Sequence, residues 1–163
     1  KEAFRQASRL TRADGGKSGI AISDPFCVDR HRIDFLDMIG NELDYVIGNQ
    51  FEIMSLFETD DLEAAINKTA DMIPLMICTK SGDGVTIIGE GKRVDIPVDP
   101  ITPVDATGAG DQFAAGFNDG MLTGRDLETC GRMGNMCAAE VISHIGPRPQ
   151  ADMKQQFLAA GLE

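Results

Sequence analysis

The sequence of 163 residues lacks several features that define common classes of protein. It has no tryptophan and one tyrosine, so an aromatic platform for stacking nucleobases is poorly supplied. No apolar run approaches the roughly 20 residues that span a bilayer, and no basic stretch with an apolar core marks a signal peptide. Only 15 lysines and arginines oppose 26 acidic residues, giving a net charge of −11. We therefore expect neither nucleic acid nor a membrane as a partner.

Side chains for a zinc site are also scarce. The four cysteines form no CxxC pair, and the chain has two histidines. Structural zinc sites need closer clustering of these residue types than the sequence offers. The cysteines are better interpreted as buried, reduced thiols in a cytoplasmic protein.

The residues that are present predict one globular domain of the α/β class. Hydrophobic residues make up 42% of the chain and charged residues 25%, a balance typical of folded domains. Apolar spacing predicts helices over residues 1–13, 29–39, 50–57, 61–72, 110–122, 126–143 and 151–160. Short apolar runs predict strands over residues 19–23, 44–47 and 74–79, and an antiparallel pair over 85–88 and 94–98. Strands that alternate with helices predict a layered, parallel-rich sheet with right-handed crossovers.

The segment Asp105–Asp111 (DATGAGD) is small, rich in glycine and directly precedes an amphipathic helix. Glycine lets a backbone approach a phosphate closely, and N–H groups at a helix N-terminus favour an anion. A carboxylate at Asp111 could then take a proton from an attacking hydroxyl. Taken alone, the segment also fits a simple turn followed by an acidic first helical turn. It is neither a GK[ST] loop nor a GxGxxG fingerprint, which disfavours a dinucleotide-binding oxidoreductase.

The same segment closely resembles the C-terminal signature, D-T-x-G-A-G-D, of the ribokinase-like (PfkB-type) carbohydrate and nucleoside kinases. Ala106 replaces the commoner threonine. The resemblance implies that Asp111 is the catalytic base. It also implies that the amides of Gly108, Ala109 and Gly110 form the anion hole for the transferred phosphoryl group of ATP.

A second segment, Asn49–Glu52 (NQFE), resembles the N-x-x-E motif of these kinases and lies between a predicted strand and helix. The resemblance implies a nucleotide-binding role for Asn49. It also implies that Glu52 holds Mg²⁺ through bound water, which agrees with the tendency of Mg²⁺ to retain waters. The residues alone fit an ordinary helix start with a glutamate three residues in.

A third segment resembles the nucleotide loop T-x-G-x-x-G. Thr79 and Gly84 fit, whereas Ser81 occupies a usual glycine position and Gly82 is displaced by one. A turn between two strands is expected here in either case. By the same resemblance, Asn135 on a late helix lies on the adenine side of the nucleotide.

The family also holds a monovalent cation, such as K⁺, mainly through backbone carbonyl groups. The resemblance places this site at Asp105, Thr107, Val141, His144 and Gly146. For His144, the residues alone favour a solvent-facing histidine at a helix end.

The motifs occur in the family's order and cover the whole chain, but they correspond only to the C-terminal half of such a kinase. The chain begins with lysine and a helical pattern, as a piece of a longer protein would. We expect residues 1–163 to be the C-terminal part of a single kinase domain. We also expect association with the N-terminal half or with a second copy, because such a piece leaves sheet edges and apolar surface uncovered.

The sequence says less about which molecule would accept the phosphoryl group. Residues 23–32 (SDPFCVDRHR) resemble a segment of bacterial adenosine-kinase-like members, and Asp24 follows a predicted strand. Ligands in open α/β sheets bind at that edge. Arg30 and Arg32 fit either a phosphate or ion pairs on a solvated helix. The resemblance implies transfer of a phosphoryl group from ATP to a primary hydroxyl. Adenosine is the first candidate for the molecule that carries this hydroxyl, and a ribose- or fructose-like sugar is the second. A catalytically silent nucleotide-binding module is the alternative.

Overall fold

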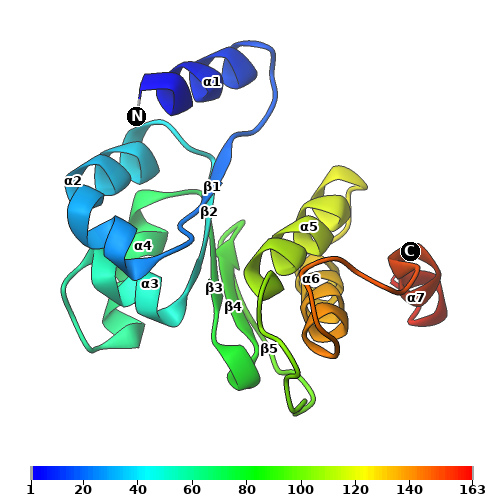
Figure 1. Cartoon of the computed structure of the whole chain (residues 1–163). Coiled ribbons are helices and arrows are strands. Elements are labelled where there is room, and N and C mark those ends of the chain that lie inside the picture. Colours follow the sequence, from blue (N-terminus) through cyan, green and yellow to red (C-terminus); the bar gives the residue numbers. More distant parts are fainter. Residues whose placement is uncertain (1, 163) are drawn as a thin grey trace. The chain divides into compact units, whose positions relative to one another are not determined.

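Five strands form the sheet of this computed structural model, which describes residues 2–162, in the order β1-β2-β3-β4-β5 (Figure 1). The strands are β1 (Gly19–Ala21), β2 (Tyr45–Asn49), β3 (Leu75–Thr79), β4 (Val85–Gly89) and β5 (Lys92–Ile96). The helices are α1 (Glu2–Ala13), α2 (Pro25–Asn41), α3 (Gln50–Leu56), α4 (Leu62–Met72), α5 (Ala109–Leu122), α6 (Leu127–Ile142) and α7 (Met153–Ala159), with a 3₁₀ turn at Ser81–Asp83. The alternating order predicted from apolar spacing is confirmed.

The first three strands run parallel, with one or two helices between each pair. Gly19 lies opposite Tyr45, and Tyr45 lies opposite Leu75. Between β4 and β5 the chain has only Glu90 and Gly91, a link so short that it joins antiparallel strands. The parallel-rich α/β sheet and its antiparallel pair therefore match the prediction.

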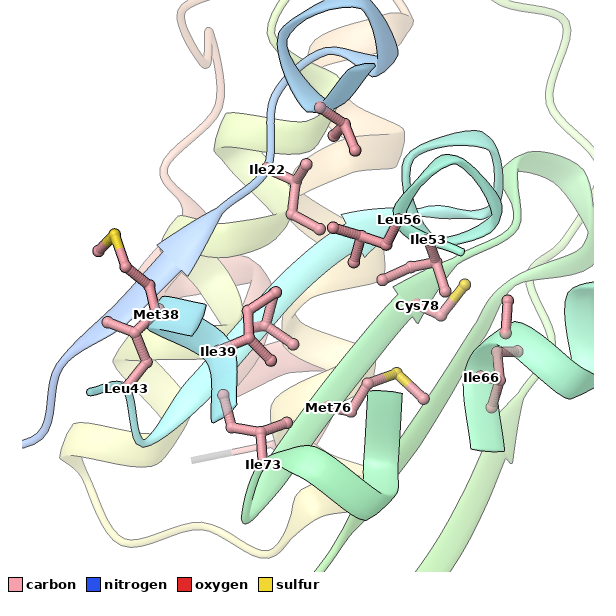
Figure 2. Close-up of a cluster of buried hydrophobic side chains, with 13 residues drawn as sticks. Ile22, Met38, Ile39, Leu43, Ile53, Leu56, Ile66, Ile73, Met76 and Cys78 are labelled. Atoms are coloured by element: carbon pink, nitrogen blue, oxygen red, sulfur yellow. The ribbon is translucent and has the colours of Figure 1, made fainter. Parts of the chain in front are cut away.

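The chain forms two compact units, each of which is described by itself. The first contains the residues up to Thr79 together with Thr86–Arg93, and the second contains Lys80–Val85 and the residues from Val94 onward. In the first unit, buried side chains from β2, β3 and α2–α4, together with Ile22 just after β1, form one core (Figure 2). Ile39, Ile53 and Met76 lie inside it and are almost fully buried. This core fixes the ends of the parallel strands.

Helices α5 and α6 form the body of the second unit. Phe113 and Phe117 are buried on α5 with ring centroids 6.0 Å apart. A Cβ on Gly116 would lie 2.6 Å from the Met133 carbonyl oxygen, so glycine permits the close approach of the two helices. The Cys137 thiol is buried in this packing, and its burial raises its pKa to about 11. Cys78, Cys130 and Cys137 are buried free thiols as predicted, whereas Cys27 is only half-buried.

Several element boundaries differ from the predictions: β1 ends at Ala21 rather than residue 23, and β5 spans Lys92–Ile96 rather than residues 94–98. Helix α2 begins at Pro25 rather than residue 29, because the Asp24 side chain caps it and proline suits a first helical position. Strand β2 continues to Asn49, two residues beyond the predicted end at residue 47. Gly48 pairs with Cys78 of β3, so the parallel ladder overrides the local tendency of glycine to break a strand.

Helix α1 is held to the first unit by polar groups. Arg5 contacts Asp37 (2.8 Å) and Glu42, while Arg12 approaches Asp44 (3.7 Å). Its apolar side chain Phe4 is 64% exposed. No helix within residues 2–162 is long and apolar enough to cross a bilayer.

Candidate active site

In the first unit, Asn49 and Thr79 lie opposite each other at the carboxyl ends of β2 and β3. The Asn49 side chain begins α3 by accepting the N–H groups of Phe51 (2.9 Å) and Glu52 (3.0 Å). The carboxylate of Glu52 accepts in return the backbone N–H and the Nδ2 of Asn49, both at 2.8 Å. The helix cap expected from the residues alone is therefore present, and it locks both side chains at the ligand-binding edge of a parallel sheet.

Glu52 is a buried carboxylate beside a second one. It is 5% exposed, and burial is the main cause that raises its pKa, with the nearby charge of Asp24 adding to the effect. The N–H of Asn49 acts in the opposite direction. Two neighbouring acidic groups at a strand edge suit a divalent cation. Within residues 2–162 no three metal-binding side chains gather, so Mg²⁺ would have to keep waters or phosphate oxygens as ligands.

The loop after Thr79 is a tight turn in the second unit. The Lys80 N–H donates to the Gly84 carbonyl (2.7 Å), and the Gly84 N–H donates to Ser81 (3.1 Å). Ser81 has φ +52°, the left-handed conformation that glycine adopts most easily. The serine therefore keeps a glycine-like backbone at the position where it departs from the family motif. Gly82 lies in the 3₁₀ turn.

The glycine-rich segment of the second unit leads into α5 through Gly108. Gly108 has φ +83°, and a Cβ there would lie 2.7 Å from the Pro147 Cβ. No side chain caps the helix at this residue. The Ala109 N–H donates to Ala106 O (3.2 Å), so within the predicted anion hole this amide already has an acceptor.

The first turn of α5 places Gly110 beside Asp111. N–H groups at these positions have no acceptor within a helix, and no capping side chain supplies one. A Cβ on Gly110 would meet nothing within 4 Å, so the backbone there faces open space. The Asp111 side chain is exposed. This arrangement can bind an anion at the amides and accept a proton at the carboxylate.

Asp105 joins the beginning of this segment to the chain after α6. Its Oδ1 accepts the Thr107 N–H (2.9 Å), and its Oδ2 accepts the Gly146 N–H (3.0 Å). Hydrogen bonding with the Thr107 side chain, then with the two backbone N–H groups, lowers the pKa of Asp105 to about 2. The structure thus brings together three of the five residues predicted for the cation site.

The other predicted residues lie on or after α6. Asn135 is half-buried, and its Nδ2 is a buried donor with no partner among the described residues, which fits a ligand acceptor. Val141 is buried in the last turn. The expectation of a solvent-facing His144 is wrong, because its side chain is 15% exposed and its Nε2 lies 3.4 Å from Glu140 Oε1.

Sequence reasoning missed Gln112, Pro147 and Glu140. Gln112 Nε2 donates to the Pro147 carbonyl (3.2 Å), and the Glu140 carboxylate accepts the N–H groups of Gln150 (2.8 Å) and Ala151 (2.9 Å). Burial raises the pKa of Glu140, but these N–H groups and His144 outweigh it, so the net shift is downward. An acidic residue in the last helical turn is disfavoured by the helix dipole, and that misfit was the available signal.

The candidate residues thus form two clusters. Asn49, Glu52 and Thr79 gather in the first unit, whereas Asp105, Thr107, Gly108 and Gly146 gather in the second, with Asp111 one helical turn away from Gly108. The catalytic and binding roles assigned to these residues stay predictions.

Comparison with known proteins matches residues 1–153 to the pfkB family of carbohydrate kinases. An uncharacterized sugar kinase of Archaeoglobus fulgidus is 40% identical over 102 residues, which cover 61% of this chain and 40% of that protein. Among solved structures, a "probable sugar kinase protein" from Rhizobium etli is 39% identical with a TM-score of 0.96, covering 99% of this chain and 50% of that one. The adenosine kinase from Sinorhizobium meliloti is 37% identical with a TM-score of 0.93, covering 97% and 49%. The chain therefore spans half or less of the length of these relatives.

Proposed function

This chain belongs to the pfkB family of carbohydrate kinases, and on that premise we propose that it forms the C-terminal part of a single ribokinase-like domain. That domain transfers a phosphoryl group from ATP to a primary hydroxyl of a nucleoside or sugar. The observation that carries the proposal is the start of α5. There, the left-handed Gly108 and an absent side-chain cap leave amides beside the exposed carboxylate of Asp111.

In the proposed reaction, Asp111 orients the acceptor hydroxyl and takes its proton as the oxygen attacks the γ-phosphorus of ATP. The new P–O bond forms as the bond to the β–γ bridging oxygen breaks, and ADP leaves with that electron pair. The amides at Gly108, Ala109 and Gly110 stabilise the charge that develops on the transferred group. Because Ala109 donates to Ala106 O in this structure, its amide must turn to contribute.

Mg²⁺, when bound, would neutralise phosphate charge, and Glu52 would hold it through water. Asn49, Thr79, Asn135 and the turn residues Ser81, Gly82 and Gly84 are proposed to bind the nucleotide. The low pKa of Asp105 keeps a negative charge beside Thr107 and Gly146. This charge supports a K⁺ site that would also use carbonyl groups at Val141 and His144.

For the acceptor, we propose adenosine first and a ribose- or fructose-like sugar second. Asp24 caps α2 directly after β1, at the carboxyl edge where Asn49 and Thr79 also lie. The similarity to the Sinorhizobium meliloti adenosine kinase supports the nucleoside, and the similarity to the Archaeoglobus fulgidus sugar kinase supports a sugar.

The test is ADP release from ATP by the intact protein, with adenosine, ribose and fructose compared side by side. Turnover with any of them that is lost in Asp111→Asn supports phosphoryl transfer with Asp111 as base. Turnover that persists in Asp111→Asn refutes the role of that residue. If no acceptor supports turnover but ADP still binds, the chain is instead a silent nucleotide-binding module.

The chain spans half or less of the length of these relatives, so nucleotide binding without turnover is the second candidate for residues 1–163 tested alone. We also propose association of these residues with the N-terminal half of the kinase domain or with a second copy. Exposed apolar side chains such as Phe4 and Ile33 support this. A clean monomer by sedimentation at micromolar concentration would contradict association of this chain with itself.

A further inference from the structure

We infer that Glu140, outside the predicted active site, is a positioning residue that fixes the glycine-rich segment through the chain between α6 and α7. The effect of Glu140 on kcat rests on the proposed function, whereas its effect on the position of the glycine-rich segment does not. Glu140 has a side chain that is 9% exposed and lies in the last turn of α6. A buried carboxylate at that end of a helix is unfavourable unless other groups stabilise it.

Backbone N–H groups supply that stabilisation. The single oxygen Oε1 accepts from Gln150 at 2.8 Å and from Ala151 at 2.9 Å, ten and eleven residues further along the chain. Hydrogen bonds to a charged acceptor are stronger than those between neutral groups. The carboxylate thus closes residues 141–151 into a loop that begins and ends at α6.

The middle of this loop touches the glycine-rich segment at two points and the residue after it, Gln112, at a third. The Gly146 N–H reaches Asp105, the Pro147 carbonyl accepts from Gln112, and the Pro147 ring lies against Gly108. The start of the loop also takes part, because the Ile142 carbonyl accepts the Val104 N–H at 2.8 Å. Pro147 therefore packs over the left-handed Gly108, and the Glu140 hydrogen bonds hold the loop that contains Pro147 in place.

If the amides after Gly108 bind the transferred phosphoryl group, this packing sets their direction. A displacement of about 1 Å at a catalytic group can reduce a rate by about 10²-fold. Loss of the Glu140 contacts should therefore lower kcat by about 10- to 100-fold while the KM of the acceptor stays unchanged, because no acceptor group contacts this loop in the proposal.

The test is hydrogen exchange of the intact protein, read by mass spectrometry over residues 104–112. Glu140→Ala should speed exchange there by about tenfold or more. Glu140→Gln should behave like the wild type, because its amide oxygen can still accept both N–H groups. Glu128→Ala, which removes an exposed carboxylate from the first turn of the same helix, is the matched control and should change nothing.

Pro147→Gly provides a second route if Glu140→Ala does not fold, since it removes the ring over Gly108 and leaves the α6 contacts intact. It should also speed exchange over residues 104–112. Unchanged exchange there in Pro147→Gly, or in a folded Glu140→Ala, would overturn the inference. A wild type without kinase activity would refute the proposed function, yet the exchange result would still decide the positioning role.

Discussion

Replacing Gly108 by alanine tests the geometry on which the proposed anion site depends. Gly108 has φ +83°, and the new Cβ would lie 2.7 Å from the Cβ and 3.1 Å from the Cα of Pro147. The left-handed conformation costs a non-glycine residue about 1–2 kcal/mol, and forcing a methyl group into a packed contact costs about 1–3 kcal/mol. We expect Gly108→Ala to lower the free energy of unfolding by about 2–5 kcal/mol.

Urea unfolding followed by circular dichroism measures this change, with the slope of the transition checked against the wild type. Gly110→Ala is the matched control two residues away, because its Cβ would meet nothing within 4 Å. We expect its stability to stay within about 0.5 kcal/mol of the wild type. If Gly108→Ala proves as stable as this control, neither the left-handed conformation nor the Pro147 contact constrains the segment.

Three further changes separate the roles of the remaining groups. Asp111→Asn should lower kcat by about 10²–10⁴-fold while calorimetry still detects ADP binding, and lost binding would contradict a pure base role. Both carboxylate oxygens of Glu52 accept a hydrogen bond from Asn49, so in Glu52→Gln the new NH₂ group would face an N–H donor of Asn49 and one hydrogen bond would be lost. This substitution should destabilise the chain by about 1–3 kcal/mol, and an unchanged thermal midpoint would count against the buried cap. The pKa of Asp105 falls from 3.8 to about 2, so its contribution is complete above about pH 4 and is lost as the pH falls toward 2. Across that interval the wild type should lose stability faster than Asp105→Asn, and parallel acid-unfolding curves would refute this.

Much of the candidate site was predictable because its rules are local. A strand followed by Asn and, three residues later, Glu predicts a reciprocal helix cap, and the Asn49–Glu52 pair forms one. A glycine-rich turn before an apolar helical pattern predicts a helix N-terminus, and α5 begins at Ala109 after the left-handed Gly108. Such patterns involve residues within four positions of one another, so both interacting residues can be recognised from the local sequence.

The contacts that sequence reasoning missed join segments that are distant in the chain. Pro147 covers Gly108, and Gln112 reaches the Pro147 carbonyl across 35 residues. His144 is different, because its Nε2 lies 3.4 Å from Oε1 of Glu140, only four residues earlier, and the sequence analysis overlooked this local pair. Strand β2 extends through Gly48 because β3 lies beside it. No local pattern encodes the Pro147 contacts or the β2–β3 pairing, because they depend on tertiary packing and on which strands lie side by side.

Ser81 shows why a departure from a motif need not abolish the backbone that the motif encodes. The position usually holds glycine in the resembling kinases, and this chain supplies serine, yet the residue takes φ +52°. The turn is closed by the Lys80–Gly84 and Gly84–Ser81 hydrogen bonds, which involve main-chain atoms alone. Because these bonds do not require a particular side chain, the surrounding strands can impose the left-handed conformation on a serine. What the substitution changes is the group presented at the turn, a hydroxymethyl in place of a hydrogen, and any effect on nucleotide binding must come from that side chain.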